Sequence, residues 1–115
     1  MRYMLLIYAS ETEYAHMTNE EYAGIMQGHD AFAQEAMQRG ILMGGAPLQP
    51  TSTAMTVRVR KGKTLVTDGP FAETKEQLAG TYILDCKNMD EAIELAAKIP
   101  DALYGSIEIR PTMKV

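Results

Sequence analysis

The sequence contains no tryptophan, a single cysteine and only two histidines among its 115 residues. The lone cysteine, Cys86, excludes a disulfide within the chain and is typical of proteins from a reducing compartment. The two histidines are well separated from each other and from Cys86, so their spacing resembles no zinc site. We therefore expect no disulfide framework and no zinc site, and the sequence offers no support for a metal bound by carboxylates.

A basic surface and a long apolar segment are also missing. The formal net charge of −4 and the isoelectric point near 5.1 argue against nucleic acid, because affinity for phosphates depends on a basic surface. The opening segment, residues 1–9, is too short to span a membrane and lacks a secretory cleavage site. We expect a cytoplasmic protein that binds neither nucleic acid nor a membrane. The sequence also has no phosphate-binding glycine loop and no dinucleotide fingerprint, so no cofactor is implied.

The remaining composition is that of an ordinary globular protein. Hydrophobic residues make up 46% of the chain and charged residues 23%, which is close to average usage. A chain of this length can bury a core of its own, and it contains no linker or repeat. We therefore predict a single domain over residues 1–115.

Periodicity predicts alternating strands and helices. Thr18 and Glu21 have the spacing of a capping box, and the helix that follows carries His29 within its apolar stripe. Residues 9–17 are expected to form a polar loop. The helix at residue 89 is expected to turn Met89, Ala92, Ile93, Ala96 and Ala97 inward. In order, the elements are a strand at 2–8, a helix at 19–39, a strand at 41–46, a hairpin at 55–60 and 64–67, a strand at 80–86, a helix from 89 and a strand at 104–110.

This order predicts an α+β fold, a ferredoxin-like βαββαβ arrangement with an inserted hairpin. Two helices cover only one face of such a sheet. The first strand is apolar on both faces, so the uncovered face is expected to be buried in a homodimer that packs sheet against sheet.

The segment Thr67–Glu76 differs in composition from the strands and helices predicted around it. Asp68, Gly69 and Pro70 form a turn, since glycine tolerates positive φ and proline fixes its own φ. Charged side chains and a single aromatic, Phe71, follow at once. Functional residues are common on such loops, so this segment is a candidate site.

The chain resembles the YCII-related proteins, in particular their DGPF-domain branch, named for the sequence at residues 68–71. The resemblance includes the opening strand, Gly44–Gly45, residues 48–50 and 56–58, the stretch 67–78 with Gly80, and residues 108–111. It implies a dimeric α+β barrel, in which two ferredoxin-like sheets face each other. Relatives with this barrel include muconolactone isomerases and a dehydrochlorinase, and DGPF proteins are often encoded beside extracytoplasmic-function sigma factors.

The resemblance also implies a His/Asp pair in some members, with the histidine on the first helix and the aspartate two to three turns later. His29 stands at the matching position, but the aspartate position falls near Gln38. The sequence therefore predicts an incomplete pair, and Asp68 is the candidate to supply the missing carboxylate in space.

Each candidate has a functional and a purely structural interpretation. Asp68 is a general base, a residue that orients His29, or a turn residue, and His29 is either a catalytic base or a packed core residue. Glu73 and Lys75 form either a polar pocket wall, with Lys75 binding an anion, or a solvated turn.

Phe71 is either a stacking platform or an anchor for its loop. Arg58 belongs to a basic hairpin that serves either to bind an anion or to prevent edge pairing.

Two functions follow from these alternatives. The first is a homodimer that binds a small polar or anionic molecule beside the Asp68 loop and acts by proton transfer, as an isomerase or lyase. The second is a non-enzymatic partner that senses a ligand or docks on a sigma factor.

Overall fold

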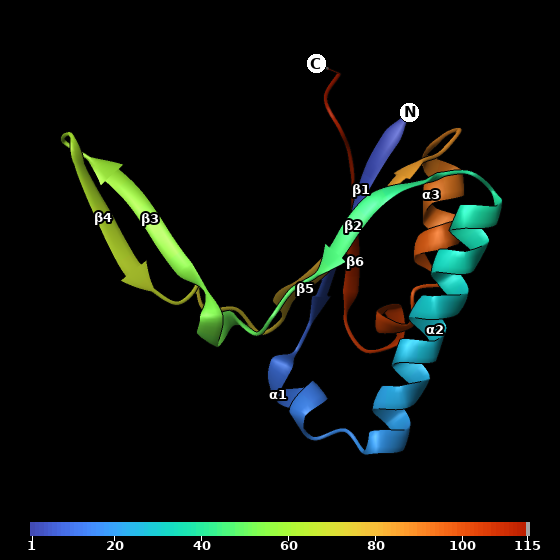
Figure 1. The fold of residues 1–115 in the computed structure, drawn as a ribbon, viewed down its shortest axis with the longest axis horizontal. Coiled ribbons are helices and arrows are strands. Elements are labelled where there is room, and N and C mark those ends of the chain that lie inside the picture. The colour runs from blue at the N-terminus through green and yellow to red at the C-terminus, as the bar shows by residue number, and fades with distance from the viewer. Residues whose placement is uncertain (115) are drawn as a thin grey trace.

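The computed structural model describes residues 1–114 and consists of a four-stranded sheet, helices on one of its faces, and a separate two-stranded hairpin (Figure 1). The long helix α2 and the shorter α3 lie on the same side of the sheet. The helical and strand elements are β1 (Arg2–Ala9), α1 (Glu11–Ala15), α2 (Asn19–Gln38), β2 (Leu42–Pro47), η1 (Thr51–Thr53), β3 (Met55–Arg60), β4 (Lys63–Asp68), β5 (Gln77–Asp85), α3 (Met89–Ala96), η2 (Pro100–Leu103) and β6 (Ser106–Pro111).

The strand order of the main sheet is β2-β5-β1-β6, and every neighbouring pair is antiparallel. Strands β1 and β2 are therefore parallel to each other with β5 between them, which is the split βαβ arrangement. The predicted α+β, ferredoxin-like fold with an inserted hairpin is confirmed. The dimeric barrel stays a prediction.

The core lies between the sheet and the two helices. Alternate residues of β1 point toward the helices and are buried, because successive side chains of a strand face opposite sides. The other face of β1 carries Met4, Leu6 and Tyr8, which are only partly buried. Strand β1 is therefore central, as predicted. The core side chains are those of Tyr3, Leu5, Ile7, Phe32, Ala36, Leu84, Cys86, Ala92, Leu95, Ala96 and Ile99.

Helix α2 begins at the predicted capping box. The Thr18 hydroxyl accepts a hydrogen bond from the Glu21 amide at 3.1 Å, and the Glu21 carboxylate accepts one from the Thr18 amide at 3.0 Å. The predicted polar loop at 9–17 was wrong, because residues 11–15 form α1. The Ser10 side chain caps that helix by accepting from the Glu13 amide.

Helix α3 is rotated relative to the prediction. Ile93 is 52% exposed and Ala97 is exposed, whereas Leu95 is fully buried. The residues that face the sheet are Ala92, Leu95 and Ala96, which keep the i, i+3, i+4 spacing of one helical face. Several similar alanines made the phase of this short helix ambiguous in the sequence.

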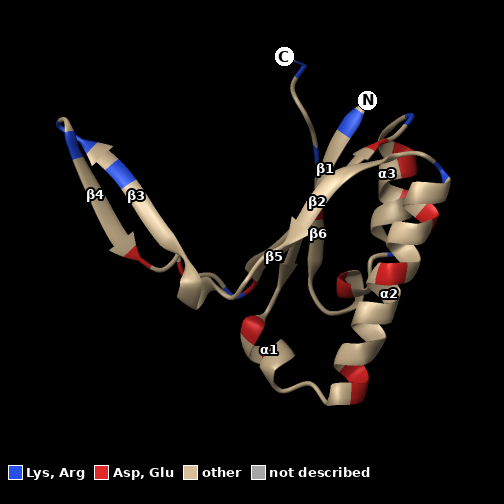
Figure 2. Ribbon diagram, in the orientation of Figure 1, with Lys and Arg blue, Asp and Glu red and all other residues tan. Residues whose placement is uncertain are grey.

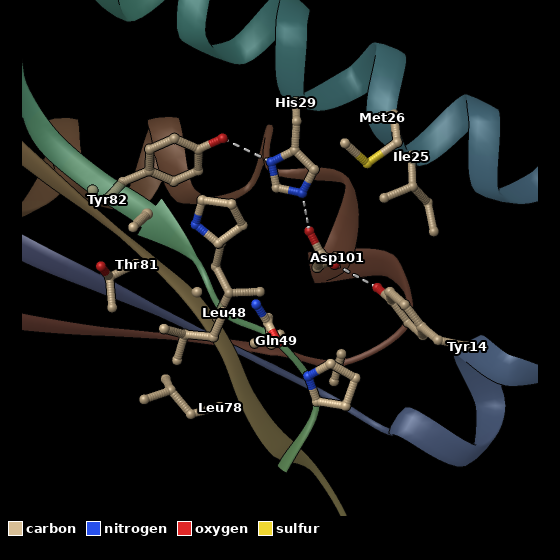
Figure 3. Close-up of a pocket in the computed structure, with 18 of the residues that line it drawn as sticks. Tyr14, Ile25, Met26, His29, Leu48, Gln49, Leu78, Thr81, Tyr82 and Asp101 are labelled. Carbon is tan, nitrogen blue, oxygen red and sulfur yellow. Dashed lines mark hydrogen bonds and ion pairs between the residues drawn. The ribbon is translucent and has the colours of Figure 1, made fainter. Parts of the chain in front are cut away.

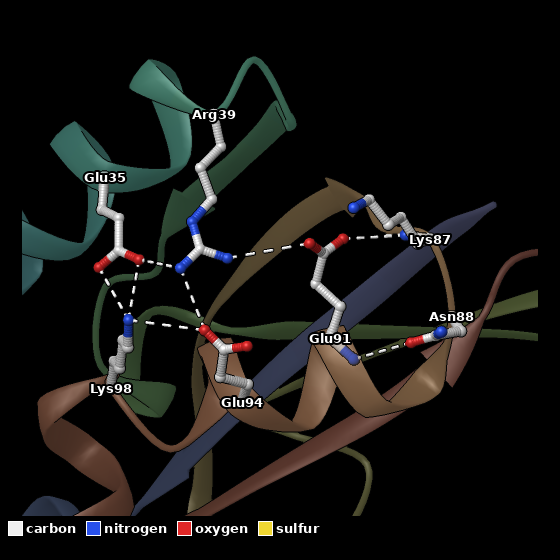
Figure 4. A network of polar contacts seen from close by, with 7 residues as sticks. All are labelled: Glu35, Arg39, Lys87, Asn88, Glu91, Glu94 and Lys98. Atoms are coloured by element: carbon white, nitrogen blue, oxygen red, sulfur yellow. Dashed lines mark hydrogen bonds and ion pairs between the residues drawn. The ribbon is translucent and has the colours of Figure 1, made fainter.

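Charged side chains link α2 to α3 at the surface (Figure 4). Arg39 forms ion pairs with Glu35, with Glu94 at 3.0 Å and with Glu91 at 3.8 Å. Lys98 pairs with Glu35 at 2.8 Å. This network joins the two helices that cover the sheet. In the part of the chain that the structure describes, no helix is long and apolar enough to cross a membrane.

Strands β3 and β4 form a hairpin that extends away from the rest of the molecule (Figure 1), and we call residues 55–68 the arm and the remainder the body. Lys61 and Gly62 both have positive φ at the predicted turn, as a tight hairpin requires. The arm exposes Val57, Val59 and Val66 by about 60% each. Its basic side chains lie toward the tip (Figure 2).

Candidate functional site

A cavity of about 730 Å³ lies between α2, the sheet and the segment that connects β2 to the arm. Apolar side chains form most of its wall, and a hydrogen-bonded group of polar side chains lies at one end, separate from Gln49 and Thr81 (Figure 3). That end is formed by His29, Tyr82, Asp101 and Tyr14, which come from four different elements. The apolar wall includes Ile7, Ile25, Met26, Leu42, Leu48 and Leu78.

His29 is held on both sides of its ring. Its Nε2 atom lies 2.5 Å from Asp101 Oδ1, and its Nδ1 atom lies 2.7 Å from the Tyr82 hydroxyl. The Tyr14 hydroxyl donates to the other oxygen of Asp101 at 2.5 Å. The four side chains therefore form one hydrogen-bonded chain from Tyr82 to Tyr14 (Figure 3).

Asp101 reaches α2 because the segment after α3 packs closely on that helix. Pro100 is the first residue of η2, and a Cβ atom added to Gly28 would lie only 2.9 Å from its ring. The absence of a side chain at Gly28, next to His29, permits this approach. Asp101 itself is 3% exposed, and its backbone carbonyl accepts from the Gly105 amide at 2.7 Å.

The protonation states follow from these contacts. Burial by itself raises the pKa of Asp101, but the hydrogen bonds from His29 and Tyr14 outweigh that effect and lower it overall. Asp101 is therefore an ionised carboxylate that only accepts hydrogen bonds. Consequently His29 Nε2 must carry a proton, and in the neutral ring Nδ1 is the acceptor for the Tyr82 hydroxyl.

The two tyrosines are both neutral donors. Burial, with a contribution from the charges of Asp101 and Asp30, raises the pKa of Tyr82 above its ordinary value. Burial and the hydrogen bond to Asp101 raise the pKa of Tyr14 in the same direction. Tyr82 thus presents a phenol, and not a phenolate, at the polar end of the cavity.

Of the six candidate residues from the sequence, His29 lines the cavity. Asp68 ends β4 and Arg58 lies within β3, so both belong to the arm. Phe71, Glu73 and Lys75 lie in the exposed segment between the arm and β5. Within residues 1–114, none of these five side chains contributes to the cavity wall.

Within one chain the carboxylate that pairs with His29 is that of Asp101 and not that of Asp68, which ends β4 at the base of the arm and does not line the cavity. The position near Gln38 carries no aspartate, and Asp101 supplies a carboxylate to His29 instead. Asp101 is 72 residues from His29, and helix spacing alone could not find it. The only local indication was an aspartate directly after Pro100, at the end of a helix.

The turn at Asp68 is held by the arm itself. Gly69 has a φ of 91°, as predicted, and its amide donates to the Ala54 carbonyl at 2.8 Å. The Thr56 hydroxyl donates to the Gly69 carbonyl, also at 2.8 Å. This turn therefore closes the base of the arm where β3 begins and β4 ends.

As for a metal, residues 1–114 contain no group of three or more His, Cys, Asp or Glu side chains arranged to hold one. Asp101 already accepts hydrogen bonds on both carboxylate oxygens. Both oxygens of this carboxylate are thus already occupied by hydrogen bonds.

Comparison with known proteins agrees with the family expected from the sequence. The family model of the YCII-related domain matches residues 1–115. The chain is 41% identical over 113 residues to an uncharacterised protein of Rhizobium meliloti (strain 1021), R00369, and the match covers 96% of this chain and 91% of that relative. The two proteins thus share nearly their whole length, and the chain belongs to the YCII-related domain family.

Proposed function

We propose that the protein transfers protons on a small molecule bound in the cavity, in the manner of an isomerase or a lyase. The observation that carries this proposal is the position of His29 between an ionised, buried Asp101 and the Tyr82 hydroxyl, at one end of an apolar cavity. A carboxylate behind an imidazole fixes its tautomer and stabilises its protonated form, which makes the ring an effective general base.

The hydrogen bonds define how a ligand engages the base. When the His29 ring is neutral and its Nε2 proton is directed at Asp101, the Tyr82 hydroxyl, 2.7 Å away, donates to Nδ1. A ligand with a carbonyl oxygen competes for that donor, and when Tyr82 turns to the ligand the Nδ1 lone pair is released. Binding and activation of the base are thereby coupled through one hydroxyl group.

The chemical step then balances without a cofactor. His29 Nδ1 takes a proton from the carbon next to the carbonyl, so a C–H bond breaks and an N–H bond forms. The electron pair enters the enolate, whose oxygen accepts the Tyr82 hydrogen bond. Return of the proton to another carbon gives an isomer. In an elimination the leaving group departs from the β-carbon with its electron pair, and His29 gives its proton to that group or to water. Asp101 acts as a positioning residue throughout.

Hydrogen–deuterium exchange tests this function on many candidate substrates at once. The protein is incubated in D2O with a library of carbonyl compounds, and mass spectrometry detects those that gain deuterium. His29→Gln should slow the exchange by about 10²- to 10⁴-fold, the usual contribution of a general base. His16→Gln is the matched control, because His16 is exposed beside α1. Equal exchange by wild type and His29→Gln would refute the proposal.

We also propose that the protein is a homodimer. The face of the sheet opposite the helices carries Met4, Leu6 and Ile83, all only partly buried in one chain. Such an apolar face favours burial against a second copy. Sedimentation velocity at micromolar concentration should give a dimer, and Leu6→Glu a monomer. Leu103→Glu, at a side chain 83% exposed on η2, is the control. A monomeric wild type would contradict this proposal.

A second candidate function, binding to a protein partner, is favoured by the arm. Its exposed valines and its basic tip are surfaces that a partner could cover. The resemblance to DGPF proteins makes a sigma factor the partner to test. Pull-down with the full chain should retain such a factor, and a variant with residues 55–68 replaced by a short glycine–serine loop should not. Equal retention by both would remove the arm from that interaction.

A further inference from the structure

The charged groups of the cavity all have the same sign. Its charged side chains are Glu11 and Asp101, and within the described residues 1–114 no lysine or arginine lines it. Glu11 is fixed in place, because its two carboxylate oxygens accept from the Thr51 amide at 2.8 Å and the Thr51 hydroxyl at 2.6 Å. A ligand in the cavity therefore meets two positioned carboxylates.

The cations of this region are elsewhere. The basic cluster of Arg58, Arg60, Lys61 and Lys63 belongs to the arm, which extends away from the body (Figure 2), and none of these residues lines the cavity. Lys75, the predicted anion anchor, lies on the exposed segment before β5. Both candidates that the sequence offered for holding an anion are thus outside the cavity.

We propose that the cavity selects uncharged, largely apolar molecules that carry a single carbonyl oxygen, and that it excludes carboxylates and phosphates. This inference rests on the proposed proton-transfer function and names its substrate class. It replaces the polar or anionic ligand expected from the sequence.

The physical reason is the balance of desolvation and charge. An anion that enters this cavity loses its water, gains no cation and approaches Asp101 and Glu11, so its transfer is unfavourable. An apolar skeleton instead covers Ile25, Met26 and Leu78, and its carbonyl oxygen accepts from Tyr82. The volume of about 730 Å³ is within the range of typical small-molecule sites.

A pair of matched probes tests the substrate class. 2-Acetylnaphthalene is a neutral ketone with acidic C–H groups, and 2-naphthoate has the same ring system with a carboxylate in place of the acetyl group. Titration followed by ligand fluorescence should show that the ketone binds at least about tenfold more tightly than the carboxylate, a difference of about 1.4 kcal/mol.

A substitution that adds a cation should reduce or abolish this preference. Leu48 lines the cavity and is 52% exposed, so it tolerates a longer polar side chain. Leu48→Arg should increase the affinity for 2-naphthoate by about tenfold or more and change that for the ketone much less. Leu48→Gln is the control of similar polarity without charge, and it should leave the preference of the wild type in place.

The outcomes separate this inference from the proposed function, because NMR in D2O also reports exchange at the methyl group of the bound ketone. If the wild type prefers 2-naphthoate, or if neither probe binds up to its solubility limit, the substrate class is wrong. If the ketone binds as expected but His29→Gln exchanges its methyl protons as fast as wild type, the substrate class stands and the proton-transfer function fails.

Discussion

The body and the arm use similar residues in opposite ways. In the body, the main sheet and helices α2 and α3 place apolar side chains into a shared core, and the buried carboxylate of Asp101 is paired with the partly buried His29 and Tyr14. In the arm, two strands pair only with each other and their valines remain exposed. An isolated two-stranded hairpin has little stability of its own in water. The clustering of charged residues in the sequence thus did not indicate the candidate site. The hydrogen bond between His29 and the buried Asp101 did.

The largest difference between the body and the arm is expected when an apolar side chain is truncated to alanine. Leu84 is fully buried in β5, and Leu84→Ala should lower the free energy of unfolding by about 2–5 kcal/mol, through lost burial and the cavity it leaves. Val59→Ala in the arm should change it by less than about 0.5 kcal/mol, as is usual at exposed positions. Urea denaturation measures both. A loss above about 2 kcal/mol for Val59→Ala would show that the arm is buried in solution.

Two aspartates provide a second comparison. Asp101→Asn should lower the free energy of unfolding at neutral pH by about 1–3 kcal/mol, because it disturbs a buried, fully paired carboxylate. Asp68→Asn, at an exposed position, should change it by less than about 0.5 kcal/mol. Chemical denaturation at neutral pH gives both values.

The two aspartate variants are also expected to differ in how their stability depends on pH. The pKa of Asp101 is lowered in the folded protein, so the unfolded chain binds the proton first as the pH falls. The stability that Asp101 provides is therefore present above its unfolded pKa of about 4 and is lost as the pH falls toward its lower, folded pKa. Asp101→Asn should flatten this acid limb, and Asp68→Asn should leave it unchanged. An unchanged acid limb in Asp101→Asn would contradict the assignment of Asp101 as an ionised group.

Alanine substitutions at two glycines of α2 test how the site is assembled. Gly24 has open space around it, so Gly24→Ala should stabilise the protein by about 0.5–1 kcal/mol through helix propensity. Gly28→Ala adds a methyl group 2.9 Å from the Pro100 ring, so this gain should be cancelled or reversed. Because Pro100 precedes Asp101, only Gly28→Ala should also slow proton exchange. Equal stabilisation by both would mean that η2 does not pack closely on α2.

The smallest expected effect concerns two arginines. Arg39 pairs with three carboxylates of the body, whereas Arg58 forms no ion pair within residues 1–114. Arg39→Gln should lower the melting temperature slightly at low salt, and the difference should shrink as salt screens the network. Arg58→Gln should leave the melting temperature unchanged at either salt concentration. Thermal scans at two ionic strengths make the comparison, and equal shifts for both variants would contradict it.

Much of the fold could be predicted because it depends on local patterns. The alternation in β1, the Thr18–Glu21 capping box and the Lys61–Gly62 turn each specify their element within a few residues. The errors fell where local patterns were weak. Residues 11–15 were too few to show helical periodicity, and the alanines of α3 did not distinguish one helix face from another.

The site was predicted only in part. His29 could be singled out because it interrupts an apolar stripe, and in the structure it faces the cavity. Its carboxylate partner could not, because Asp101 is brought to it by the packing of Pro100 on Gly28 and not by sequence spacing. The contact between Tyr82 and His29 likewise depends on tertiary packing, because the two residues are 53 positions apart in the chain.

By itself, the sequence determined the order of strands and helices, the ferredoxin-like class and the family, because these depend on periodicity, capping and a motif contiguous in the chain. Only the tertiary structure decided that the Asp68 segment closes the base of a projecting arm, and that His29 pairs with Asp101. The reason is that hydrogen-bonded partners 72 residues apart are chosen by how helices pack on a sheet, which no local pattern encodes.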